Sequence, residues 1–139
     1  MFLYTKTIKK NIDFKRMYYR SKFKIGFLTV IYYKKNKNKE TKLGITVSKK
    51  VGNAVKRNRV RRIILAAYKE LEKQENLKGS TFVIVARKNC FKVKMWDVFK
   101  ELKKNIFFVR KKETKKISIS WKNLCDNFVL KVGCFWKIL

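Results

Sequence analysis

The sequence contains no histidine, and only nine of its 139 residues are acidic. Histidine is the side chain most often used for general acid–base catalysis, so this sequence offers few residues for that chemistry. A two-metal nuclease needs several carboxylates that converge on its ions, and these carboxylates are scattered along the chain. Only Glu70, Glu72 and Glu75 are close in sequence, and on a helix their spacings do not converge. We therefore expect no catalytic residue and no metal ligand in this chain.

Cysteine is also scarce, and Cys90, Cys125 and Cys134 form no CxxC pair. Without histidine such a set excludes an ordinary zinc site, and an odd number without a disulfide pattern fits a reducing compartment. The N-terminus lacks the apolar core of a signal peptide, and no apolar run is long enough to cross a bilayer. There is no Walker loop and no GxGxxG motif. The sequence predicts a cytoplasmic protein with no transmembrane segment and no small-molecule substrate.

Positive charge dominates what is present, because 38 lysines and arginines give a net charge of +29. Charge of this density implies a polyanionic partner: nucleic acid, an anionic membrane surface or an acidic protein. An AT-rich genome can raise the number of lysines without a functional reason, so the positions of the arginines are the better indicator of a binding site. Four of the eight arginines, Arg57, Arg59, Arg61 and Arg62, fall within six residues. A guanidinium group can grip a phosphate with two hydrogen bonds, which lysine cannot do.

Hydrophobic periodicity predicts the element order helix–strands–helix–strand–helix. The expected elements are a helix over Asn11–Arg20 capped by Asn11, strands over Lys24–Tyr33 and Lys42–Ser48 paired as an antiparallel hairpin, a helix over Ala54–Gln74 capped by Asn53, a strand over Thr81–Ala86 parallel to Lys42–Ser48, and a helix over Trp96–Val109. This order predicts an α+β fold, a single-domain sandwich with a small mixed sheet and a βαβ crossover. We expect one domain over residues 1–110, followed by a basic break and an apolar, aromatic tail of unknown role over residues 111–139.

The long predicted helix carries the arginines opposite or beside an apolar stripe. The stripe consists of Val60, Ile63, Ile64, Ala67 and Leu71. Asn58, Arg61 and Arg62 lie opposite it, with Arg57 and Arg59 on its flanks. This polar side is either a solvated charged face or a surface that docks on a folded RNA backbone.

Aromatic residues form a second candidate site. Phe14 and Tyr18 are four residues apart and share one helical face, and Phe27, Tyr32 and Tyr33 lie on the following strand. These rings either belong to the core or form a stacking platform for single-stranded bases beside a basic groove.

The segment KLGITVSKKVGNAVKRNRVRR, residues 42–62, resembles the signature of the bacterial ribonuclease P protein subunit. The flanking segments KKNIDF (residues 9–14) and FVIVARK (residues 82–88) are similar to the same family, so the resemblance spans about residues 5 to 109. It implies an α+β sandwich whose crossover through the arginine helix is left-handed. Physical principles alone favour a right-handed crossover.

The resemblance also implies a function. The family's subunit binds a catalytic RNA, ribonuclease P RNA, and together they remove the 5′ leader of precursor tRNA, with the chemistry carried by the RNA and its Mg²⁺ ions. The residues matching the surface that docks on the catalytic RNA are Arg57, Asn58, Arg59, Arg61 and Arg62. The residues matching the leader-binding cleft between the first helix and the sheet are Phe14, Tyr18, Phe27 and Tyr32, with Lys49, Lys50 and Arg87 supplying charge.

Two alternatives remain open at the level of sequence. A structural RNA-binding protein of the ribosomal type would share the charge and the arginine helix without needing the aromatic cleft. A polybasic protein of the membrane surface would need a long amphipathic basic helix that faces lipid.

Overall fold

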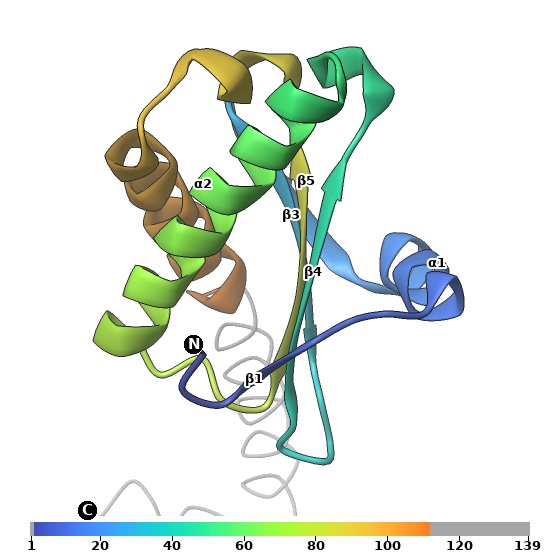
Figure 1. The fold of residues 1–139 in the computed structure, drawn as a ribbon. Helices are drawn as coiled ribbons and strands as arrows, with labels where there is room; N and C mark the ends of the chain where they lie inside the picture. Colours follow the sequence, from blue (N-terminus) through green and yellow to red (C-terminus); the bar gives the residue numbers. More distant parts are fainter. Residues whose placement is uncertain (1, 112–139) are drawn as a thin grey trace, which may run out of the picture. The chain divides into compact units, whose positions relative to one another are not determined.

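Five strands form one mixed sheet in the order β1-β4-β5-β3-β2 in the computed structural model, which describes residues 2–111 (Figure 1). The strands are β1 (Thr5–Thr7), β2 (Lys22–Ile25), β3 (Thr29–Lys35), β4 (Thr41–Val47) and β5 (Ser80–Ala86). β1, β4 and β5 are parallel, whereas β3 is antiparallel to β5 and β2 is antiparallel to β3. The predicted α+β class and the parallel pairing of β4 with β5 are confirmed. The predicted tail lies outside the described residues, apart from residue 111, and the domain boundary stays a prediction.

The helices are α1 (Asn11–Arg20), α2 (Ala54–Gln74) and a third helix over residues 95–111, with short 3-10 helices η1 (Lys49–Val51) and η2 (Lys88–Lys92). The predicted cap of α2 is confirmed, because Asn53 Oδ1 accepts a hydrogen bond from the Lys56 N–H at 3.0 Å. The predicted cap of α1 is wrong. Lys10 occupies the cap position, Asn11 is already helical, and no side chain caps this end.

The predicted hairpin between Lys24–Tyr33 and Lys42–Ser48 is also wrong. The first segment is itself a hairpin of β2 and β3, and β5 lies between β3 and β4. β5 takes the central place because it is apolar on both faces and six of its seven residues are buried. β3 pairs with it along its full length, from Thr29↔Ala86 to Lys35↔Ser80. Strand β1 was not predicted, because three residues are too few to show an alternating pattern.

Helices cover both faces of this sheet, with α2 on one side and α1 on the other (Figure 1). Of the predicted stripe on α2, Ile63 is half-buried and the others are buried. The third helix packs in the same core through Val98, Phe99, Leu102, Ile106 and Val109. Because the stripe of α2 is enclosed by the core, it offers no apolar face to lipid. Within residues 2–111, no helix is both long and apolar enough to cross a membrane.

The handedness of the crossover from β4 through α2 to β5 stays a prediction. The two strands that it joins are adjacent and parallel, with register pairs from Lys42↔Thr81 to Val47↔Ala86. They therefore end at the same edge of the sheet, and the segments that follow them, η1 after β4 and η2 after β5, lie close together there.

A buried carboxylate on α2 holds the N-terminal segment. Glu72 is only 3% exposed, and it accepts hydrogen bonds from the backbone N–H of Leu3 at 3.0 Å and of Tyr4 at 3.3 Å. It also accepts one from the hydroxyl of Thr5 in β1. Tyr68, one turn earlier on α2, lies 3.4 Å from the same hydroxyl, and burial raises the pKa of its phenol. The edge strand β1 is thus attached to α2 as well as to β4.

Replacing Glu72 with alanine is expected to lower the free energy of unfolding by about 2–3 kcal/mol, because it leaves buried donors without an acceptor. Urea denaturation measures the change. Glu70→Ala on the same helix is the matched control, since it removes only an ion pair with Lys73 and a hydrogen bond from the exposed Gln74 side chain. The decrease in the free energy of unfolding caused by Glu70→Ala is expected to stay at about 0.5 kcal/mol. Equal effects of the two variants would contradict the anchoring role of Glu72.

Candidate nucleic-acid interface

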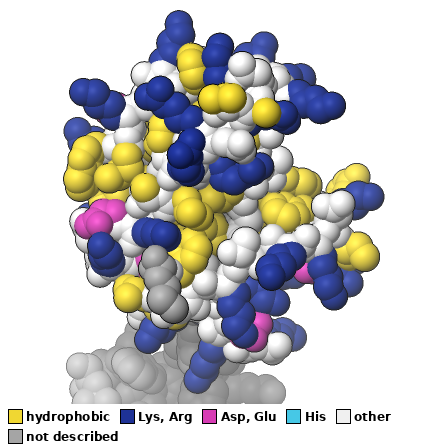
Figure 2. All heavy atoms as spheres, viewed as in Figure 1, with side chains coloured by type: hydrophobic (Ala, Val, Ile, Leu, Met, Phe, Trp, Pro, Cys, Tyr) yellow, Lys and Arg dark blue, Asp and Glu magenta, His cyan; other side chains and the backbone are white. Residues whose placement is uncertain are grey.

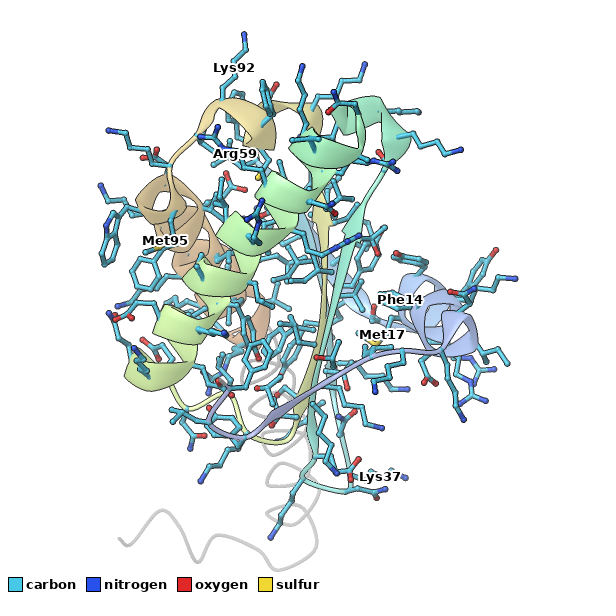
Figure 3. All side chains as sticks on the ribbon, in the orientation of Figure 1. Phe14, Met17, Lys37, Arg59, Lys92 and Met95 are labelled. Atoms are coloured by element: carbon cyan, nitrogen blue, oxygen red, sulfur yellow. The ribbon has the colours of Figure 1, made fainter. Side chains whose placement is uncertain are left out.

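The N-terminal half of α2 presents the arginine cluster to solvent. Gly52 precedes the helix with φ +148°, a conformation that favours glycine, and a Cβ there would lie 2.8 Å from the Lys56 side chain. This turn leads from η1 into α2. Asn58, Arg59, Arg61 and Arg62 are exposed. Figure 3 shows Arg59 on the helix, and Figure 2 shows lysine and arginine side chains gathered over the same face.

Arg57 differs from its neighbours because it is half-buried. Its Nε is buried and has no hydrogen-bond partner within the described part of the chain. Among residues 2–111, none of the arginines on α2 forms an ion pair. Since a cationic surface without carboxylates is not neutralised internally, it remains available to phosphate groups.

Helix α1 lies across the opposite face of the sheet, with Phe14 and Met17 directed toward the strands (Figure 3). A Cβ at position 44 would lie 2.5 Å from Phe14 Cε1, so Gly44 in β4 makes room for that ring. Phe14 is half-buried and packs against the cluster formed by Ile8, Met17 and Val83. It therefore has a packing role, whichever ligand the surface binds.

Three aromatic rings meet beside α1. Tyr18 meets Tyr32 edge-on at 5.1 Å between centroids, and Phe23 in β2 lies 5.9 Å from Tyr32. The Tyr18 hydroxyl lies 3.0 Å from Thr46 Oγ1, which holds the ring over β4. Tyr18 is 36% exposed and Phe23 is 59% exposed. We call Tyr18, Phe23, Ile25 and Tyr32 the aromatic surface.

The sequence analysis missed Phe23 and Ile25. They are the cross-strand partners of Tyr32 and Val30, and so they face the same side of the sheet. A turn at Gly26 would have revealed this pairing, because it places Phe23 opposite Tyr32 in a hairpin.

The predicted basic residues gather at one edge of the sheet. Lys49 and Lys50 follow β4 in η1, and Arg87 follows β5, where the two parallel strands end. Arg87 Nη1–H donates to the Gly26 carbonyl at 2.8 Å. Phe27, in the turn between β2 and β3, is exposed and makes no ring contact with Tyr18 or Tyr32. The structure thus joins Tyr18 with Tyr32 and places Phe27 apart from them, in the turn whose Gly26 and Leu28 carbonyls accept hydrogen bonds from Arg87.

Glu101 in the third helix fixes that turn from the other side. Its carboxylate accepts hydrogen bonds from the backbone N–H groups of Leu28 at 2.9 Å and Thr29 at 2.8 Å. A Cβ at position 26 would lie 2.4 Å from Glu101 Oε1, so the close approach requires Gly26. Nothing in the sequence marked this contact, which spans more than 70 positions.

Metal or thiol chemistry in residues 2–111 would have to use their acidic side chains or Cys90. Among residues 2–111, no group of three or more acidic or cysteine side chains is placed to hold a metal ion. The buried Glu72 and the half-buried Glu101 are occupied by backbone N–H groups. Burial raises the pKa of Cys90 to about 11, so this thiol stays protonated at neutral pH.

Comparisons with known proteins agree on one family. The family model described as Ribonuclease P matches residues 2–113. A ribonuclease P protein component of Clostridioides difficile is 42% identical over 100 residues, which cover 71% of this chain and 87% of that protein. One from Bacillus cereus is 37% identical over 110 residues, which cover 78% of this chain and 91% of that protein.

Solved structures show the same fold. The Staphylococcus aureus RNase P protein matches with a TM-score of 0.65 at 31% identity, covering 73% of this chain and 93% of that one. The RNase P protein from Thermotoga maritima matches with a TM-score of 0.64 at 23% identity, covering 76% and 96%, and supports the fold alone.

The sheet, the helices on both of its faces and the unpaired arginines define a small basic α+β sandwich protein. Within that class, the chain belongs to the ribonuclease P protein family.

Proposed function

We propose that this chain is the protein subunit of ribonuclease P, which binds ribonuclease P RNA and the 5′ leader of precursor tRNA in the cytoplasm. The observation that carries the proposal is the placement of two surfaces on opposite faces of one sheet. The arginines lie on α2, and the aromatic surface lies beside α1. One subunit can therefore contact two RNA segments at once.

The arginine helix is the proposed site for the catalytic RNA. Arg57, Asn58, Arg59, Arg61 and Arg62 project from two consecutive turns of one rigid helix. Phosphate contacts of this kind position an RNA backbone without reading its sequence. The exposure of four of these side chains supports the proposal.

The aromatic surface is the proposed site for the leader. Bases can stack on Tyr18, Phe23 and Tyr32 irrespective of sequence, which suits a subunit that serves tRNAs with different leaders. Lys49, Lys50 and Arg87 at the adjoining sheet edge would hold the phosphates, and Phe14 supports α1 from beneath. Phe27 belongs to the turn bonded by Arg87 and would meet the leader there.

We assign the hydrolytic chemistry to the RNA. Mg²⁺ ions held by the RNA and the substrate would supply the activated nucleophile and stabilise the leaving oxygen. The part of this chain that the structure describes has no carboxylate cluster to hold such ions. Its contribution is to bind and orient RNA.

The purified protein, freed of RNA and supplied with Mg²⁺, is expected not to cleave precursor tRNA, whereas adding ribonuclease P RNA restores 5′ processing. Gel analysis of the tRNA 5′ end measures both reactions. Correct processing by RNA-free protein would refute the assignment of the chemistry to the RNA.

A structural protein of the ribosomal type is the second candidate, since it too would present an arginine helix. Sequencing the RNA that copurifies with the chain separates the two functions. Ribonuclease P RNA as the dominant species supports the proposal, and ribosomal RNA would replace it with the alternative.

A further inference from the structure

Helix α1 divides one face of the sheet into two parts. Below it, Gly44, Val83, Tyr32 and Phe23 form one continuous cross-strand row. The next row toward η1 contains Thr46, Val85, Val30 and Ile25 and belongs with the aromatic surface. On the side of the first row that points away from η1, the neighbouring row contains Lys42, Thr81 and Lys34. A single-stranded ligand on the aromatic surface would therefore meet a chemically different region beyond α1.

A pocket of about 380 Å³ occupies that second region, within the range of small-ligand sites. It lies between α1 and the loop joining β3 to β4. Its lining residues include Arg16, Lys34, Lys35, Lys37, Lys42, Asp13 and Glu40. Five cations thus face two carboxylates, so the pocket carries a net positive charge.

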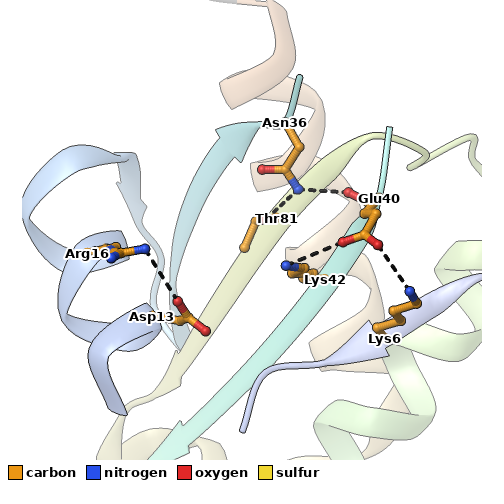
Figure 4. Close-up of polar contacts among 7 residues, drawn as sticks. All are labelled: Lys6, Asp13, Arg16, Asn36, Glu40, Lys42 and Thr81. Carbon is orange, nitrogen blue, oxygen red and sulfur yellow. Dashed lines mark hydrogen bonds and ion pairs between the residues drawn. The ribbon is translucent and has the colours of Figure 1, made fainter. Parts of the chain in front are cut away.

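The carboxylates in the pocket are already engaged (Figure 4). Glu40 accepts from Lys6 Nζ at 3.1 Å and lies 3.4 Å from Lys42 Nζ, and these ammonium groups lower the pKa of Glu40. Asp13 lies 3.9 Å from Arg16 Nη1. Within residues 2–111, Lys34, Lys35 and Lys37 form no ion pair. These three ammonium groups are available to an incoming anion.

The Asn36 side chain holds the wall of the pocket in place. Its Nδ2 donates to the Glu40 carbonyl and to Thr81 Oγ1, both at 2.7 Å (Figure 4). The loop that bears Lys37 is therefore tied to the central strand β5 at its base, while Lys37 itself extends to the tip (Figure 3).

A second depression extends from the pocket toward the C-terminal end of α1. It shares Arg16 and Lys34 with the pocket and is also lined by Ile12, Lys15, Tyr19 and Arg20. Tyr19 is 88% exposed and adjoins Tyr18 in sequence. Lys34 is two residues beyond Tyr32, so both face the same side of β3. Cations and one exposed ring thus line a route between the two regions.

The direction of the route follows from the position of the arginine helix. α2 begins just after η1, beside the end of β4, whereas the pocket lies at the start of β4 near Lys42. Figure 3 labels Arg59 and Lys37 toward opposite ends of the sheet. Under the proposed function the RNA docked on α2 carries the cleavage chemistry, so the cleavage site would lie nearer to the η1 end and the pocket would be the more distant region.

We propose that the basic pocket between α1 and the β3–β4 loop binds phosphates of the leader nucleotides furthest from the cleavage site. This inference rests on the proposed function and extends the leader path beyond the aromatic surface. The leader would pass over Tyr18 and Tyr32, round the end of α1, and place its backbone against Arg16 and Lys34.

The test uses reconstituted holoenzyme and a series of precursor tRNAs whose leaders lengthen one nucleotide at a time. For the wild-type protein, affinity is expected to rise with leader length to a plateau. For Arg16→Ala with Lys34→Ala, the plateau is expected at a shorter leader. With long leaders the slope of log affinity against log salt should fall by about 1.4, since each contact to a single strand contributes about 0.7. Mature tRNA and the shortest leaders should bind as they do to the wild type.

Two further variants serve as controls. Lys100→Ala with Lys104→Ala removes the same charge from exposed positions of the third helix and is expected to leave the plateau unchanged. Lys35→Ala with Lys37→Ala removes charge from the pocket without altering α1. In this variant, affinity is expected to reach its plateau at a shorter leader length. This second pair keeps the test valid if the first variant folds poorly.

Each outcome decides the inference. An unchanged plateau in both pocket variants overturns it. An equal loss at every leader length, or weaker assembly with ribonuclease P RNA, also overturns it and assigns the pocket to the catalytic RNA. If the wild-type protein itself shows no dependence on the leader, the proposed leader-binding function fails and the inference fails with it.

Discussion

Arg57→Ala combined with Arg59→Ala is expected to weaken binding to ribonuclease P RNA by about 100-fold. Hydrogen bonds to charged groups contribute about 1.5–3 kcal/mol each, and 1.4 kcal/mol corresponds to a factor of ten in affinity. The slope of log affinity against log salt should also fall by about 2, one for each lost phosphate contact. Filter binding across a salt titration measures both quantities.

Two controls separate phosphate contacts from folding. Arg59 is exposed, so Arg59→Ala alone should keep the wild-type melting temperature while losing about half of the binding effect in free energy. Arg57→Lys with Arg59→Lys keeps the charge but removes the planar fork, so its affinity should fall between those of the wild type and the double alanine variant. Unchanged affinity of the double alanine variant at every salt concentration would exclude α2 as the docking surface.

Tyr18→Ala combined with Phe23→Ala is expected to weaken holoenzyme binding to precursor tRNA by about 10-fold or more. Stacking of one base on an aromatic ring contributes about 1–3 kcal/mol, and these two rings flank Tyr32 on the partly exposed surface. Mature tRNA lacks the leader and should bind almost as before. Titrations of both tRNAs with the same holoenzyme preparation provide the comparison.

A structural role for the rings has a different signature. If Tyr18 and Phe23 only support the fold, the double variant will have a lower melting temperature and bind precursor and mature tRNA equally weakly. Phe14→Ala is the matched comparison, because Phe14 packs over Gly44 and its removal should lower stability. Tyr18→Phe keeps the ring and loses only the hydroxyl near Thr46, so it should retain leader binding.

The sequence alone determined the features that depend on local patterns. The bounds of α1 and α2 and the buried stripe of α2 follow from helical spacing, and the Asn53 cap follows from capping chemistry, because both act over a few residues. The arginine cluster on α2 was visible in the same way, since one helix places all its members. The family was recognisable because residues 42–62 carry its motif without interruption.

Only the tertiary structure decided how distant segments pair. β5 lies between β3 and β4 because its two apolar faces bury most surface at the centre, and no local pattern specifies that order. The β2–β3 turn then sets Phe23 opposite Tyr32, and Glu101 holds the turn from the third helix. The pocket between α1 and the β3–β4 loop likewise joins Arg16, Lys34 and Lys42 from three elements. Such sites depend on strand order and register, which are set by the burial of the whole sheet and not by any one segment.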